Sequence, residues 1–67
     1  MIEIEVNGAP RQVEPGHTLH DLVVALQLDG QALALAVNRA VVPRQRWREV
    51  QLAGADRVDI VRAIGGG

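Results

Sequence analysis

The first eight residues constrain the fold more than any other stretch of this chain. Isoleucine and valine alternate with glutamate over residues 2–6, which is the period-two pattern of a strand with one buried face. Asn7-Gly8 follows directly, and both residue types tolerate the positive φ of a two-residue hairpin turn. We expect residues 11–13 to return as the second strand. Because Pro10 has no N–H to donate, this strand is expected at an edge of the sheet or with an irregular start.

A helix is predicted over about residues 18–28. Thr18 can cap its N-terminus, and Asp21 three residues on resembles a capping box and favours the positive end of the helix. Four apolar residues at helical spacing form one stripe that can face a core: Leu19, Leu22, Val23 and Leu26. Asp29-Gly30 is expected to end the helix.

Three further strands are expected after the helix. Residues 33–37 are apolar at every position, as in a strand in the middle of a covered sheet. Asn38-Arg39 is a candidate turn into a short strand over residues 41–42, and a final strand around residues 58–60 leads to the glycines. Asp56 is expected to shape the turn before that strand. The order predicts an α+β domain, with a mixed β-sheet of four to five strands packed on one main helix.

Length and composition exclude several function classes. A chain of 67 residues allows one domain, and the absence of cysteine removes thiol nucleophiles, disulfides and zinc-thiolate sites. A net charge of −1 argues against nucleic acid as a partner. No apolar run reaches membrane-spanning length, and the N-terminus lacks the basic and apolar regions of a signal peptide. We expect a cytoplasmic protein with no membrane contact and no cofactor.

Two side-chain groups have a functional and a structural interpretation. His17 and His20 suggest a metal pair, but two ligands without a convergent third are weak evidence, so we predict no metal site and place them beside the helix cap. The arginines of residues 44–48 surround Trp47, the only aromatic residue, and such a pair can stack on nucleic acid. We favour a solvated loop with Trp47 partly packed against the core.

The end of the sequence, Ile64-Gly65-Gly66-Gly67, is unusual because glycine loses the most freedom on ordering. It is either a frayed end or a carboxylate that must enter a narrow partner site, since a tail without side chains permits close approach. Ile64 is either an exposed apolar anchor for a partner or the residue that closes the core.

Several motifs occur together in one short chain. They are Val6-Asn7-Gly8, the capped helix, Ala36-Val37-Asn38 followed by Val42-Pro43-Arg44 and Trp47, the turn at Gly54-Ala55-Asp56, and the final Gly-Gly. Over its whole length the chain resembles the ThiS family, the sulfur carrier proteins of thiamine biosynthesis, which are small ubiquitin-like β-grasp proteins. The stretch between the helix and the final strand is the most specific part of the resemblance.

The resemblance implies a protein cosubstrate with no catalytic residues of its own. An E1-like adenylating enzyme of the ThiF type would activate the carboxylate of Gly67 with ATP, and a sulfur donor protein would convert it to a thiocarboxylate. Thiazole synthase of the ThiG type would then receive the sulfur. Gly66 and Gly65 complete the tail motif, although the family often has alanine at the position of Gly65. The division implied is a β-grasp domain over residues 1–64 and a flexible tail over residues 65–67, with Arg62 and Ile64 as partner-binding residues.

Two other classes stay open at this point. One is a related carrier with another destination, either the small subunit of molybdopterin synthase or a ubiquitin-like protein modifier. The other is a β-grasp interaction domain whose tail takes no part in chemistry. Conversion of the terminal carboxylate to a thiocarboxylate separates the carriers from the interaction domain.

Overall fold

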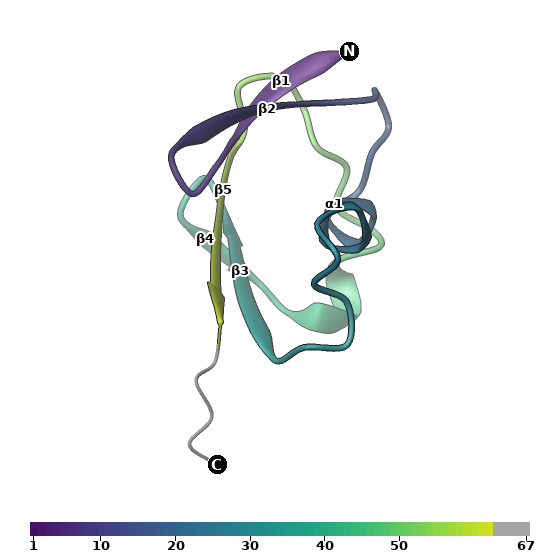
Figure 1. Cartoon of the computed structure of the whole chain (residues 1–67), viewed down its shortest axis with the longest axis vertical. Coiled ribbons are helices and arrows are strands. Elements are labelled where there is room, and N and C mark those ends of the chain that lie inside the picture. The colour runs from purple at the N-terminus through teal and green to yellow at the C-terminus, as the bar shows by residue number, and fades with distance from the viewer. Residues whose placement is uncertain (63–67) are drawn as a thin grey trace.

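The computed structural model describes residues 1–62. Along the chain the elements are β1 (Ile2–Val6), β2 (Ala9–Val13), α1 (Leu19–Ala25), β3 (Leu33–Val37), β4 (Ala40–Val42), a short 3₁₀ helix η1 (Arg44–Arg46) and β5 (Arg57–Arg62). The strands form one sheet in the order β2-β1-β5-β3-β4, with β1 parallel to β5 and the other neighbours antiparallel. Figure 1 shows α1 lying across one face of this sheet. The predicted α+β class, with a mixed sheet on a single helix, is confirmed.

The N-terminal hairpin forms around Asn7 and Gly8, whose φ angles are 51° and 84°. β2 begins at Ala9, two residues earlier than predicted, and lies at the edge of the sheet as Pro10 requires. Pro10 is opposite Glu5, one step from the closing pair of the hairpin. Hydrogen-bonded and non-hydrogen-bonded pairs alternate along an antiparallel ladder, and the pair that closes a two-residue hairpin is hydrogen-bonded. A backbone N–H at position 10 would therefore point away from β1. Because of this, the lack of an N–H in Pro10 removes no hydrogen bond from the ladder.

The helix begins as the sequence predicts. Thr18 Oγ1 accepts a hydrogen bond from the Asp21 N–H at 3.1 Å, and Asp21 Oδ2 accepts one from the Thr18 N–H at 3.1 Å. This reciprocal pair is a capping box, which provides partners for donors that the first helical turn leaves free.

The predicted helix end at residue 28 is wrong, because α1 ends at Ala25. Gln27 adopts a φ of 60°, in the left-handed region. The N–H groups of Gln27 and Leu28 donate back to carbonyl groups in the last helical turn, both over 2.9 Å. This pattern is a Schellman motif, so the helix stops before Asp29-Gly30 can act as its signal.

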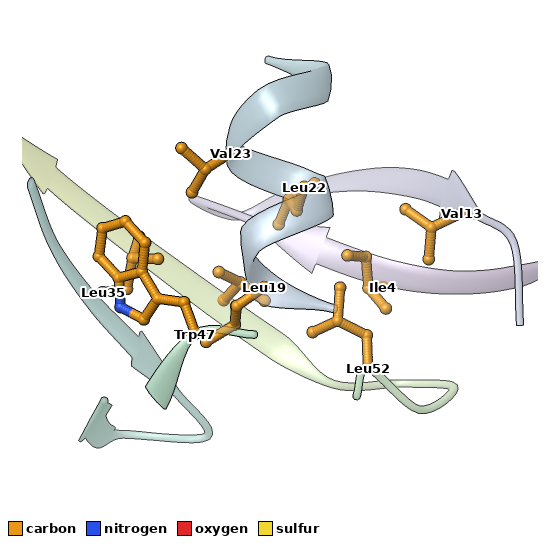
Figure 2. Packing of buried hydrophobic residues seen from close by; sticks show 9 residues of the cluster. Ile4, Val13, Leu19, Leu22, Val23, Leu35, Trp47 and Leu52 are labelled. Carbon is orange, nitrogen blue, oxygen red and sulfur yellow. The ribbon is translucent and has the colours of Figure 1, made fainter. Parts of the chain in front are cut away.

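One hydrophobic cluster lies between α1 and the sheet (Figure 2). Its buried members are Ile4, Val13, Leu19, Leu22, Val23, Leu35, Trp47, Leu52 and Val58. Trp47 is only 3% exposed and donates its indole N–H to the Val42 carbonyl at 2.9 Å. The ring belongs to the core and is more deeply packed than predicted, so it has no face free to stack on a nucleic-acid base.

Residues 33–37 form an internal strand, paired on both sides as predicted, but the prediction that both faces of this strand are covered is wrong. β3 is second from one edge, and β5 is the central strand. Leu35 faces the core and is buried, whereas Ala34 faces away from it and is exposed. In the described part of the chain no other helix or strand lies over that second face (Figure 1). The outward residues of β3 are alanines, and such small apolar side chains are tolerated on an open surface.

None of the helices in residues 1–62 has the length and apolar composition needed to cross a membrane.

Candidate functional site

Strand β5 is the element that leads toward the C-terminal glycines. The strand pairing and packing that hold β5 therefore set the position from which the chain continues to the glycines. It pairs antiparallel with β3 over five residues, from Val58 opposite Val37 to Arg62 opposite Leu33. On its other side it pairs with β1 over only two residues. Val58 is completely buried beneath the helix layer. The base of the tail is therefore part of the central strand of the domain.

Two asparagines complete the hydrogen bonding of β5. The Asn7 N–H donates to the Val58 carbonyl at 2.9 Å, and Asn7 Oδ1 accepts from the Ile60 N–H at 2.8 Å. Asn38 makes a similar pair of bonds on the side of β5 that faces β3. Its N–H donates to the Arg57 carbonyl at 2.7 Å, and its Oδ1 accepts from the Arg57 N–H at 3.0 Å. Each asparagine also takes the first left-handed position of a hairpin turn, with a φ of 51° in both cases.

Asp56 shapes the turn before β5 as predicted. Its Oδ2 accepts from the Ala53 N–H at 2.8 Å, and its Oδ1 accepts from the side-chain amide of Asn38 at 3.1 Å. A side-chain hydrogen bond thus joins this turn to the β3–β4 hairpin. It fixes the start of β5, while Asn7 holds the middle of the strand.

The face of the sheet opposite α1 presents an apolar strip that crosses three strands. Val41 and Val61 are 77% and 61% exposed. The strand register places Ala34 opposite Val61 and Ala36 opposite Val41, and directly opposed residues point to the same face. We call the set Ala34, Ala36, Val41 and Val61 the open-face strip.

Carboxylates border the open-face strip. Asp59 lies opposite Ala36, and Glu3 and Glu5 lie on β1, where alternation along the strand directs them to the same open face as Asp59. Glu5 is matched by Arg57, with a nitrogen–oxygen distance of 3.3 Å, and both side chains are about half exposed. The surface therefore combines an apolar centre with an acidic margin.

The open-face strip was not predicted, although the sequence contains a signal for it. Val41-Val42 and Ile60-Val61 are consecutive β-branched pairs within strands. Successive strand residues point to opposite faces, so in a sheet covered on one side one member of each pair must point to solvent. Such pairs mark an exposed apolar surface once the one-helix architecture is predicted.

Of the residues predicted to bind partners or to form the tail, the structure places Arg62, which is exposed at the end of β5. The remaining predicted residues, Ile64, Gly65, Gly66 and Gly67, lie outside the described residues.

The histidines lie beside the helix cap as predicted. The backbone and side-chain hydrogen bonds with Thr18 hold the pKa of Asp21 below its usual value, and His17 and His20 add a smaller effect in the same direction. Among residues 1–62, no three side chains of the histidine, cysteine and carboxylate types are arranged to hold a metal ion.

Comparison with known proteins assigns the family. The model of the ThiS family matches residues 4–67. The chain belongs to the ThiS family. The sulfur carrier protein ThiS of Escherichia coli is 30% identical over 66 residues, which cover 98% of this chain and 100% of that protein. The crystal structure of ThiS from Geobacter metallireducens has a TM-score of 0.81 and 23% identity, and covers 98% of this chain and 100% of that one.

Larger proteins also contain a segment of this kind. A thiazole synthase from Magnetococcus marinus is 36% identical over 66 residues, and one from Paramagnetospirillum magneticum is 29% identical over 66 residues. The match covers 98% of the chain but only 20% of either synthase, so the chain spans a fifth of those relatives.

Membership of the ThiS family confirms three predictions made from the sequence. The fold is the ubiquitin-like β-grasp, with five strands and one α-helix within residues 1–62. The protein is a sulfur carrier of thiamine biosynthesis. It is a small carrier protein rather than an enzyme.

Proposed function

We propose that the chain carries sulfur as a thiocarboxylate at Gly67 and delivers it, in the cytoplasm, for formation of the thiazole of thiamine. The observation that carries this proposal is the family match, which continues through the terminal glycines to residue 67. The domain then comprises residues 1–64, and residues 65–67 are the tail that enters the partner.

The chemistry requires a partner because a carboxylate is a poor electrophile. An adenylating enzyme of the ThiF type would let a carboxylate oxygen of Gly67 attack the α-phosphorus of ATP, with pyrophosphate leaving. Sulfur at the oxidation level of sulfide, supplied through a donor protein, then displaces AMP, which carries away one of the original oxygens. The product is the thiocarboxylate, and no residue of this chain acts as acid or base.

The length and composition of the C-terminal segment suit this role. Residues 63–67 can extend at most about 18 Å from Arg62, at roughly 3.3–3.6 Å per residue. Gly65, Gly66 and Gly67 have no side chains, so a partner can approach their backbone closely. Ordering each residue costs about 1–2 kcal/mol, which limits affinity and favours release after sulfur transfer. The rigid base at β5 means that this cost is confined to the tail.

Docking would use the surface around the tail. We assign Arg62 and Ile64 as contacts at its base and the open-face strip as the larger apolar contact. Exposed apolar patches with a polar border are typical of protein interfaces. Thiazole synthase of the ThiG type is the proposed acceptor, supported by the two synthases that contain a segment similar to this chain within one polypeptide.

Intact mass measurement tests the proposal. The full chain is incubated with the adenylating enzyme, ATP and a sulfur source, and replacement of one oxygen by sulfur is expected at the C-terminus. Omission of ATP is the control. An unchanged mass with an active adenylating enzyme refutes the carrier chemistry. Transfer of sulfur to a molybdopterin precursor, instead of to thiazole synthase, would refute the destination only.

A further inference from the structure

A pocket of about 380 Å³ lies between α1, the loop that follows it and the segment that contains η1. The residues of its lining that matter here are Arg44, Arg48, Asp29, His20, Val23 and Trp47. We call it the basic pocket. With the histidine neutral, two arginines and one aspartate give the lining a net charge of +1. The carrier chemistry described above uses none of these side chains.

Arg44 is held in place at the basic pocket by two contacts. Its guanidinium carbon lies 4.7 Å from the centroid of the Trp47 ring, and one of its nitrogens donates to the Gln31 carbonyl. Trp47 is itself fixed, since it is buried and donates its indole N–H to the Val42 carbonyl. A guanidinium has five N–H donors, so Arg44 keeps donors for a further acceptor. An arginine fixed in this way loses less side-chain freedom on binding.

The positive charges of the basic pocket have no matching carboxylate inside the domain. In the part of the chain that the structure describes, the recorded ion pair joins Arg57 to Glu5, at another place on the surface. Asp29 lines the basic pocket but forms no ion pair with either of its arginines in residues 1–62. Both arginines are exposed. The basic pocket is therefore suited to an anionic group from outside, which can accept charge-assisted hydrogen bonds.

The basic pocket lies at the end of the domain from which the chain continues to the glycines. Gln31, to which Arg44 donates, comes two residues before Leu33, and Leu33 is opposite Arg62 at the end of β5. Figure 1 shows the start of β3 and the end of β5 together at this end of the sheet. A protein that takes up the C-terminus therefore has the basic pocket within reach.

We propose that the basic pocket binds the carboxylate of an aspartate or glutamate side chain on the adenylating enzyme. This inference rests on the function proposed above, in which that enzyme takes up the C-terminus of the unmodified chain. One carboxylate matches the net charge of +1, whereas a phosphate ester carries about −1.5 to −2 at neutral pH and would lie beside Asp29. An exposed ion pair alone contributes little, so the carboxylate belongs to a larger protein surface and not to a free small molecule.

Calorimetric titration of the full chain with the adenylating enzyme tests the proposal. Arg48→Gln should weaken binding about fivefold to tenfold at low salt, and the loss should shrink as the salt concentration rises. Arg44→Gln should weaken binding as well, but it also loses its contacts within the domain, so its melting temperature is measured beside it. Arg46→Gln is the matched control, because it removes the same charge from η1 at a residue that does not line the basic pocket.

Asp29→Asn should have the opposite effect and tighten binding. The change removes a negative charge that repels the incoming carboxylate and leaves both arginines in place. Glu14→Gln is the control, since it makes the same change of charge outside the basic pocket. A merely structural role of the arginines would give no gain of affinity in Asp29→Asn.

Equal affinities of Arg48→Gln and Arg46→Gln would overturn the proposal, as would an Asp29→Asn variant that binds no more tightly than Glu14→Gln. A loss seen with thiazole synthase but not with the adenylating enzyme would overturn the assigned partner. At a saturating concentration of carrier, every variant should still form the thiocarboxylate, because the reacting terminus is unchanged. The proposal can therefore fail while the mass change of the original chain is observed, and only absence of that change tells against the carrier function.

Discussion

Replacement of Thr18 by alanine should destabilise the domain while leaving its core composition unchanged. The substitution removes the hydroxyl that accepts the Asp21 N–H at 3.1 Å and so breaks one half of the capping box. Loss of a threonine cap costs about 1 kcal/mol, within a range of roughly 0.5–2 kcal/mol. The effect should be clear because α1 has only seven residues, which is far too short to be stable without its cap and its packing.

Thermal unfolding followed by circular dichroism measures this loss. For a domain of 60–100 residues, about 1 kcal/mol corresponds to a shift of roughly 4–8 °C in the melting temperature. Thr18→Ser is the matched control, because serine keeps the hydroxyl and should lose much less. The carrier reaction should proceed normally in both variants at a temperature well below their transitions. A Thr18→Ala variant that melts with the original chain would show that the capping box contributes nothing, and the account of the helix start would be wrong.

Three further predictions concern acid stability, docking and the terminus. Because the pKa of Asp21 is lowered in the folded state, its contribution is present above the ordinary aspartate pKa of about 3.9 and is lost as the pH falls further; Asp21→Asn should flatten that acid limb in pH-dependent melts. Val41→Asp, at a side chain 77% exposed, should weaken binding to thiazole synthase in calorimetry with an unchanged melting temperature, whereas full binding would exclude the open-face strip. Deletion of Gly67 withdraws the carboxylate by up to about 3.6 Å and should abolish ATP–pyrophosphate exchange without affecting folding. Full exchange would move the reacting terminus to Gly66.

Sequence reasoning succeeded where the structural cause is local. The Asn7-Gly8 turn, the Thr18 cap and the edge position forced by Pro10 each depend on a few neighbouring residues, and each is confirmed. The end of the helix was missed because Gln27 adopts a left-handed conformation that glycine or asparagine usually takes. Nothing in the residue type signals that choice.

The surroundings of β3 were missed for a different reason. The sequence pattern shows which side chains of a strand are apolar, but it does not show whether both faces are buried. A small residue such as Ala34 is tolerated both in a core and on a surface. The decision depends on how many elements are available to cover the sheet, and a chain with one helix can cover only one face. The open-face strip follows from this count, and only the strand register shows that its four members are neighbours.

The two asparagines show how one residue type serves the turn and the carrier role together. A two-residue hairpin needs a first residue that tolerates positive φ, and asparagine is among the few that do. Its side-chain oxygen can then reach a backbone N–H on the next strand, as Asn7 does for Ile60 and Asn38 for Arg57. β5 is short of backbone partners beside β1, where pairing covers only two residues, and Asn7 supplies a bond there. The strand that leads to the glycines is thereby hydrogen-bonded from both sides, by Asn7 beside β1 and by Asn38 and the β3 ladder on the other.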